Sequence, residues 1–150
     1  MNIVQHLKLF FEPRSLAFIG ASRKTAAKDG DTNPVETMMR DGYKGKIYPV
    51  NPNASEIMGL KSYRCIGDVP GDVDLVVVSL PREGLVKAVT ECIQKRIKAI
   101  ILYSMGLDDG EDDEGKRIQA EAIRIARDGG ARIVGPNTFG VINAFNGLNT

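Results

Sequence analysis

Residues 16–22 read Leu-Ala-Phe-Ile-Gly-Ala-Ser, a short apolar run that ends in a glycine and two small residues. Apolar runs of four or five residues, bounded by turn-forming residues, are typical of strands that are buried on both faces of a parallel sheet. Further runs of this kind occur at residues 47–50, 75–79 and 99–102, and a shorter one of three residues occurs at 132–134. The sequence therefore predicts about five buried parallel strands.

Helical patterns lie between these runs. The segment Asn33-Pro34-Val35-Glu36 combines an N-cap residue, a proline at the first helical position and a glutamate three residues after the cap. Residues 83–95 and 114–128 repeat apolar side chains at helical spacing. Alternating strands and helices predict βαβ units. The expected fold is therefore α/β, a Rossmann-type doubly wound parallel sheet with the spatial strand order 3-2-1-4-5.

Length and charge limit the classes of partner. The chain has 150 residues, with 20 Lys and Arg against 19 Asp and Glu, and a formal net charge of +1. This length suits one domain. Non-specific binding to nucleic acid or to a membrane surface needs a basic excess, and no run reaches the roughly 18 apolar residues of a membrane span. We therefore expect one domain with no nucleic-acid or membrane partner.

The cysteines and the single histidine predict no metal site. Cys65 and Cys92 stand apart from each other and from His6, and this spacing fits neither a zinc site nor a disulfide framework. Reduced thiols are typical of a cytoplasmic protein. Cys92 is expected in the core, on the apolar face of its helix. Residues 1–11 are expected to lead straight into the first strand without a signal peptide, with His6 at the surface.

The turn after the first strand is a candidate phosphate-binding loop. Gly20 allows a sharp turn and a close approach of backbone N–H groups to a phosphate, Ser22 adds a hydroxyl, and Arg23 and Lys24 add positive charge. The dinucleotide fingerprint G-x-G-x-x-G is absent. The second strand ends at Asn51, where NAD enzymes place a carboxylate on the ribose. NAD is therefore disfavoured, whereas a ligand with a phosphorylated ribose remains compatible.

An ordered set of short motifs supports a more specific interpretation. It comprises Gly20-Ala-Ser, Gly-Lys-Ile-Tyr-Pro-Val-Asn-Pro at 45–52, Gly59 before Tyr63, Val-Asp-Leu at 73–75, Leu80-Pro81, and Gly-Pro-Asn-Thr-Phe-Gly at 135–140. Over nearly the whole chain this set resembles the CoA-binding domain of the NDP-forming acyl-CoA synthetases, relatives of the succinyl-CoA synthetase α subunit. The resemblance implies that coenzyme A lies along the carboxyl edge of the sheet. It also implies a full enzyme that joins an acid to CoA at the expense of a nucleoside triphosphate, through a phosphohistidine.

The resemblance also implies a set of binding residues and no catalytic residue in this chain. Thr138 stands where the family commonly has a cysteine, which excludes a thiol role at that position. The implied CoA-binding residues are Gly20, Ala21, Ser22, Arg23 and Lys24 at the phosphates, Asn51 and Pro52 at the adenosine, Ser79, Leu80 and Pro81 along the ligand, Ser104, Met105 and Gly106 at the pantetheine arm, and Asn137 and Thr138 at the thiol end.

These observations lead to one principal expectation and three alternatives. Residues 1–150 are expected to form the CoA-binding, N-terminal part of a longer synthetase chain, inactive alone, with a histidine-bearing domain and an ATP-grasp domain as partners. The alternatives are a stand-alone CoA-binding regulator, the CoA-binding part of an acetyltransferase fusion, and an NADP-binding module in which Arg23 and Lys24 accept the 2′-phosphate.

Overall fold

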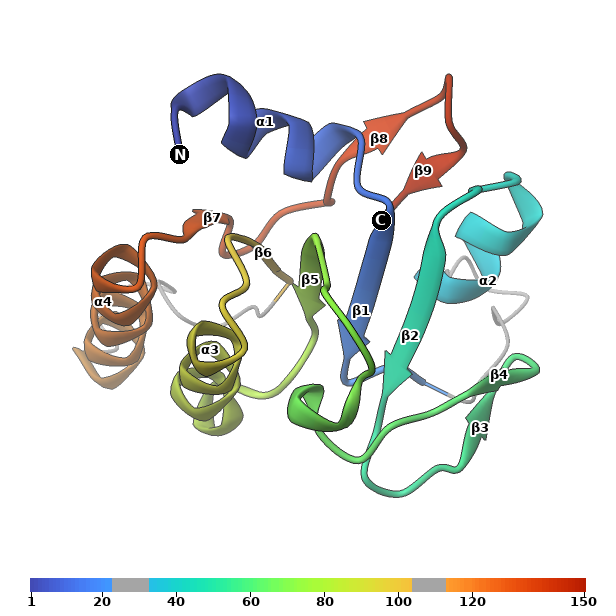
Figure 1. Cartoon of the computed structure of the whole chain (residues 1–150). Coiled ribbons are helices and arrows are strands. Elements are labelled where there is room, and N and C mark those ends of the chain that lie inside the picture. Colours follow the sequence, from blue (N-terminus) through green and yellow to red (C-terminus); the bar gives the residue numbers. More distant parts are fainter. Residues whose placement is uncertain (23–32, 104–112) are drawn as a thin grey trace.

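A five-stranded parallel sheet forms the centre of the molecule. The computed structural model describes residues 1–22, 33–103 and 113–150 (Figure 1). All pairings within this sheet are parallel, which confirms the predicted α/β class. The strands are β1 (Ser15–Ile19), β2 (Lys46–Val50), β5 (Leu75–Val78), β6 (Ala99–Leu102) and β7 (Arg132–Val134).

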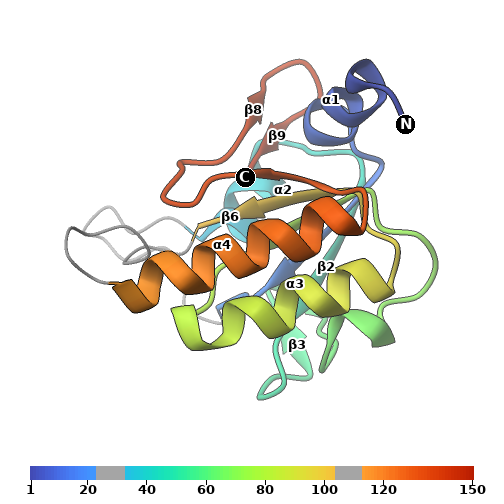
Figure 2. The same ribbon diagram turned by 90° about the vertical axis from the view of Figure 1, so that its left-hand side faces the viewer.

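Both faces of the sheet are covered, as a doubly wound fold requires. Helices α3 (Leu85–Gln94) and α4 (Asp113–Asp128) pack side by side on one face, where Val76 and Val78 of β5 join their core (Figure 2). The opposite core contains Leu75 and Val77 of the same strand. Successive side chains of a strand point to opposite faces, so a run buried on both faces is apolar at every position. The other face is covered by α1 (Ile3–Phe11), α2 (Pro34–Arg40) and the last two strands, β8 (Ile142–Asn143) and β9 (Leu148–Asn149).

The spatial order of the strands differs from the predicted order. The sheet runs β2-β1-β5-β6-β7, which is 2-1-3-4-5 in the numbering used for the expected strands, not 3-2-1-4-5. The position beside β2 is taken by Tyr63, which pairs with Val50, and by the short hairpin of β3 (Glu56–Ile57) and β4 (Leu60–Lys61). The third strand, β5, therefore pairs with the free side of β1. This order moves the point where the winding reverses to the gap between β1 and β5.

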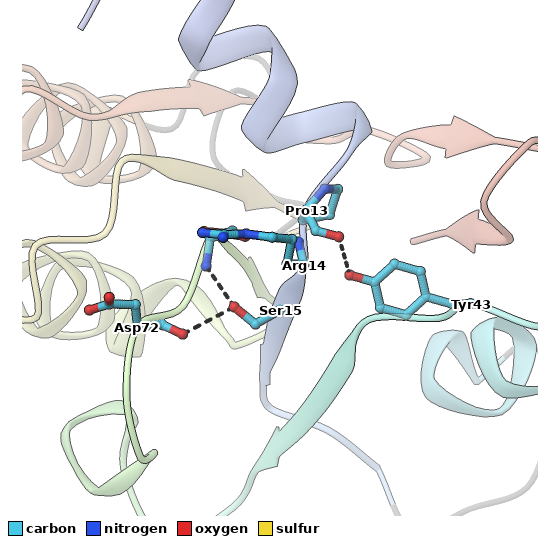
Figure 3. A network of polar contacts seen from close by, with 6 residues as sticks. Pro13, Arg14, Ser15, Tyr43 and Asp72 are labelled. Atoms are coloured by element: carbon cyan, nitrogen blue, oxygen red, sulfur yellow. Dashed lines mark hydrogen bonds and ion pairs between the residues drawn. The ribbon is translucent and has the colours of Figure 1, made fainter.

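Polar contacts at the amino ends of β1 and β5 hold these two strands together (Figure 3). The Ser15 hydroxyl donates to the Asp72 carbonyl oxygen at 3.1 Å and accepts the Asp74 N–H at 3.1 Å. The Arg14 N–H donates to the Asp74 carboxylate at 2.8 Å. Beside them, the Tyr43 hydroxyl donates to the Pro13 carbonyl oxygen at 2.7 Å, and burial raises the pKa of Tyr43 to about 12. These contacts align the start of β5 with β1 rather than with β2.

The helices begin and end close to the predicted positions. Asn33 caps α2 as expected, because its side-chain oxygen accepts the N–H of Val35 at 3.0 Å. Two short 3-10 turns, η1 (Ile66–Asp68) and η2 (Arg82–Gly84), precede β5 and α3. Cys92 is fully buried on α3, which confirms its predicted place in the core.

The amino-terminal segment departs from the prediction. Residues 3–11 form α1, capped by Asn2, where a direct entry into the first strand was expected. His6 is buried, not on the surface: its ring nitrogens lie 3.1 Å from the Asn2 carbonyl oxygen and 3.3 Å from the Gly130 carbonyl oxygen. The buried residues of α1 are His6 and Phe10, and Leu9 packs partly buried against the same core, whereas Ile3, Val4, Leu7 and Phe11 are exposed. Because apolar residues lie on both sides of this helix, the apolar periodicity did not mark which face packs. No helix within residues 1–22, 33–103 and 113–150 combines the length and apolar character that crossing a bilayer requires.

Candidate functional site

The carboxyl ends of β1 and β5 meet at the point where the sheet reverses its winding. The chain leaves β1 toward α2 on one face and leaves β5 toward α3 on the other. Ligands of open α/β sheets bind in the crevice at such a point. Gly20 follows β1, and Ser79 follows β5. The structure therefore brings these two predicted site residues together.

Gly20 is fixed by a close approach of two backbones. Its φ is +87°, and its N–H donates to the Val50 carbonyl oxygen of β2 at 3.0 Å. A Cβ at this position would overlap the carbonyl oxygen of Ser79. Only glycine fits both the positive φ and the contact. The loop that follows β1 is thereby held against the ends of both β2 and β5.

A cavity of about 460 Å³ opens beside this glycine, between the carboxyl ends of β1 and β2, the segment that follows β5 and the first half of α3. Four of the predicted residues line it: Gly20, Asn51, Pro52 and Leu80. Its deeper wall is apolar, with Val50, Ile66 and Ala88 buried. Its remaining lining residues are Ile19, Asn53, Arg64, Cys65, Gly84, Lys87 and Glu91.

Three residues of this cavity carry charge, and the sequence interpretation missed all of them. Arg64 is exposed, and Lys87 lies 3.9 Å from Glu91 on the same helix. Arg64 belongs to the connection between β2 and β5, whose path follows from the observed strand order rather than the predicted one. Lys87 lies on the first turn of α3. In the sequence nothing distinguishes it from the solvent-exposed lysines that are common on helices. The cavity thus combines an apolar wall with a charged rim.

The other predicted residues that the structure describes lie at different places along the same edge. Ala21 is buried and Ser22 is exposed in the loop after β1, and Pro81 precedes the turn η2. Asn137 and Thr138 follow β7, two strands beyond β5, and do not line the cavity. Arg23, Lys24, Ser104, Met105 and Gly106 lie outside the described residues.

The turn after β7 is also built on a close backbone approach. Gly135 has a φ of +104°, and a Cβ there would overlap the carbonyl oxygen of Leu102 at the end of β6. The Thr138 hydroxyl accepts the N–H of Gly140 at 3.1 Å. This bond fixes the Thr138 side chain toward its own turn. Phe139 between them is fully exposed.

A larger cavity, of about 680 Å³, lies elsewhere, along the outer edge of β7 between α1 and α4. His6, Lys98 and Arg132 are among its lining residues, and no residue predicted for the site lines it. We therefore place the candidate site at the smaller cavity, where the strand ends converge. Across the described parts of the chain, no cluster of three or more His, Cys, Asp or Glu side chains is arranged to hold a metal ion.

Comparison with known proteins identifies the family. The model of the family described as "CoA binding domain" matches residues 14–144. This chain belongs to the CoA-binding domain family. Family membership makes coenzyme A the ligand of the chain and confirms the resemblance seen in the motifs. The matched span includes every strand of the parallel sheet and the turn after β7.

The relatives of this CoA-binding domain are larger proteins. The acetate–CoA ligase (ADP-forming) II of Archaeoglobus fulgidus is 42% identical over 147 residues, which are 98% of this chain and 21% of the relative. The acetate–CoA ligase (ADP-forming) II subunit alpha of Pyrococcus furiosus is 34% identical and shares 95% of this chain and 30% of its own length. The chain thus spans between about a fifth and a third of the length of these relatives.

A solved structure shows the same fold in a comparable setting. It is the "dinucleotide forming acetyl-coenzyme A synthetase 1" of Ca. Korarchaeum cryptofilum, in complex with phosphate and ADP. It superposes with a TM-score of 0.84 at 34% identity, over 97% of this chain and 30% of that chain. The Rossmann-type domain described here therefore occurs as one part of a longer synthetase chain in that protein.

Proposed function

We propose that coenzyme A binds across the carboxyl ends of β1 and β5, and that the chain is the CoA-binding part of an NDP-forming acyl-CoA synthetase. The observation that carries the proposal is the cavity beside Gly20, which opens where the sheet reverses its winding. Membership of the CoA-binding domain family and the names of the relatives support it.

Each end of the ligand has a distinct place in this proposal. The phosphates are proposed to lie along the loop from Gly20 to Ser22, where Gly20 makes the turn and backbone N–H groups that follow such a turn can bind anions. The adenosine occupies the cavity, and its base lies against the apolar wall. Arg64 and Lys87 at the rim provide positive charge for the phosphate on the ribose. The pantetheine arm extends along the strand ends toward Asn137 and Thr138. Asn51 and Pro52 flank the adenosine, and Ser79, Leu80 and Pro81 lie along the ligand. Arg23 and Lys24 at the phosphates and Ser104, Met105 and Gly106 at the pantetheine arm complete the proposed contacts.

The chemical step is proposed to need further domains. The full reaction converts an acid, CoA and a nucleoside triphosphate to acyl-CoA, a nucleoside diphosphate and phosphate, through a phosphorylated histidine. His6 is the only histidine here; its side chain is buried on the inner face of α1 and contacts the carbonyl group of Gly130, just before the amino end of β7, whereas the cavity lies at the carboxyl ends of the strands. A histidine-bearing domain and an ATP-grasp domain are therefore proposed as the partners that supply phosphoryl transfer.

Cys65 provides a direct test of where the ligand binds. It lines the cavity and is partly exposed, whereas Cys92 is fully buried and burial raises the pKa of its thiol to about 12. Because the thiolate is the reactive form, only Cys65 is expected to react with iodoacetamide in the folded chain. Saturating acetyl-CoA, whose own sulfur is blocked, is expected to slow alkylation of Cys65 at least fivefold, an order-of-magnitude figure for a thiol shielded by ligand. Peptide mass spectrometry over time gives both rates.

The same experiment contains its controls. In denaturant both cysteines are expected to react at similar rates, with or without acetyl-CoA, which shows that the ligand does not consume the reagent. An unchanged Cys65 rate at a concentration of acetyl-CoA that saturates the folded chain would place the ligand outside this cavity.

A further inference from the structure

We propose that Asn33 and Asn51 are positioning residues for coenzyme A. Through their side-chain amides they hold the segment Gly20–Ser22, directly after β1, in its binding conformation, and they act on the ligand through this segment. The inference rests on the proposed function, since it concerns the loop that is proposed to hold the CoA phosphates. It gives Asn33, which the sequence marked only as a helix cap, a positioning role in CoA binding. It gives the Asn51 side chain the same role, exerted through the loop and not by direct contact with the ligand.

Asn33 uses both ends of its amide. It is 6% exposed, its Oδ1 accepts the N–H groups of Val35 at 3.0 Å and Glu36 at 3.5 Å, and its Nδ2 donates to the Ser22 carbonyl oxygen at 3.0 Å. The two backbone N–H groups require an acceptor, so the oxygen must face the helix and the nitrogen must face the loop. A single buried side chain therefore links the first turn of α2 to the carboxyl end of β1.

Asn51 repeats this arrangement from a different segment. Its Oδ1 accepts the N–H of Asn53 at 2.8 Å, within the turn that follows β2, and its Nδ2 donates to the Ala21 carbonyl oxygen at 2.9 Å. The amide orientation is again fixed by the backbone N–H that needs an acceptor. Two asparagine side chains thus hold the carbonyl groups of two consecutive residues, Ala21 and Ser22.

Holding these carbonyl groups sets the direction of the neighbouring N–H groups. In a trans peptide the C=O and the N–H that share one plane point in opposite directions. The bond from Asn51 to the Ala21 carbonyl therefore directs the Ser22 N–H away from Asn51. Gly20 fixes the start of the loop by its contact with Ser79, and the two asparagines fix the residues after it. A loop ordered before binding loses less conformational freedom when the ligand arrives, so affinity increases without a new contact.

Serine substitutions separate this role from the local role of each asparagine. Serine is as good an N-cap as asparagine, and its hydroxyl also closes turns of the Asn51 type. Asn33→Ser and Asn51→Ser therefore keep the local acceptor but remove the amide donor that reaches the loop. Each variant is expected to bind CoA about three- to tenfold more weakly in calorimetry, the weight of one neutral hydrogen bond. The melting temperature is expected to fall by only a few degrees, because the same bond also contributes to the stability of the free chain.

Two further variants complete the design. Asn2→Ser is the matched control, because Asn2 caps α1 through the Gln5 N–H and donates no bond to the loop; its CoA affinity is expected to equal that of the unmodified chain. Asn33→Ala removes the cap and the donor together, and is expected to lower both the melting temperature and the CoA affinity.

The outcomes divide clearly. Weaker CoA binding by the serine variants, with a melting temperature lowered by no more than a few degrees, supports the positioning role. The role is overturned if CoA affinity is unchanged in both serine variants, or if the loss of affinity across the series of variants simply follows the loss of melting temperature. In either case the asparagines act only as local caps. If the unmodified chain itself does not bind CoA, the proposed function fails and not merely this inference.

Discussion

Gly20→Ala is expected to lower the free energy of unfolding by at least about 2 kcal/mol and to remove measurable CoA binding. The left-handed backbone alone costs an L-residue roughly 1–2 kcal/mol, and Gly20 has a φ of +87°. The added methyl group also overlaps the Ser79 carbonyl oxygen, which belongs to backbone and has no rotamer by which to move away. The chain must therefore separate the ends of β1 and β5, where the ligand is proposed to bind. Urea unfolding and calorimetric titration at low temperature measure the two effects.

Gly59→Ala is the matched control for this substitution. Gly59 also has a positive φ, of +76°, but nothing lies within 4 Å of the position that its Cβ would take. The Gly59→Ala variant is expected to lose only the roughly 1–2 kcal/mol of stability that the left-handed backbone costs an alanine, and to keep its CoA affinity. If the two alanine variants lose equal stability and bind CoA equally, the close approach at Gly20 has no role in the fold or the site.

Leu75→Ala is expected to lower the free energy of unfolding by about 2–5 kcal/mol, the range for a large aliphatic side chain truncated in a packed core. Leu75 is fully buried at the start of β5, in the core beneath α2 and the C-terminal hairpin. In the observed order β5 lies between β1 and β6, so this side chain has neighbours on both sides. In the order predicted from sequence the same strand lies at the edge, where truncation is less damaging. Denaturant unfolding monitored by circular dichroism gives the value.

The control for this variant is Leu7→Ala. Leu7 lies on the outer side of α1 and is 47% exposed, so its truncation is expected to change stability by no more than about 0.5 kcal/mol. A cost for Leu75→Ala as small as that for Leu7→Ala would contradict the central position of β5.

The sequence predicted the elements of this fold better than their order. Each apolar run became a strand within one residue of its expected bounds. The three central strands, β1, β5 and β6, are buried at every position and are therefore apolar throughout, whereas the edge strands β2 and β7 are partly exposed. Asn33 and Pro34 placed the start of α2 correctly, because capping is a local interaction. The order of the strands depends instead on residues 51–74, which form a small hairpin and a 3-10 turn and no crossover helix. Two-residue strands of this kind carry no periodicity from which their position follows.

The sequence likewise predicted the part of the candidate site that lies at strand ends, but not the residues that depend on the path of the chain between strands. Residues at the carboxyl ends of parallel strands share one edge, so Gly20, Asn51 and Leu80 were expected together and the structure brings them to one cavity. Arg64 and Cys65 reach this cavity only through the observed path between β2 and β5. The hydrogen bonds that the side-chain amides of Asn33 and Asn51 donate to the loop join residues that are 11 and 30 positions apart in the sequence. They depend on the tertiary structure, so no local sequence pattern indicates them.

A calorimetric titration of this chain with coenzyme A, in parallel with NADP, tests the central claim most directly. The CoA-binding edge predicts that CoA binds at one site per chain and that NADP binds at least tenfold more weakly, a difference of about 1.4 kcal/mol. The absence of binding by CoA up to millimolar concentration, or tighter binding of NADP than of CoA, would contradict the assignment of this edge to coenzyme A.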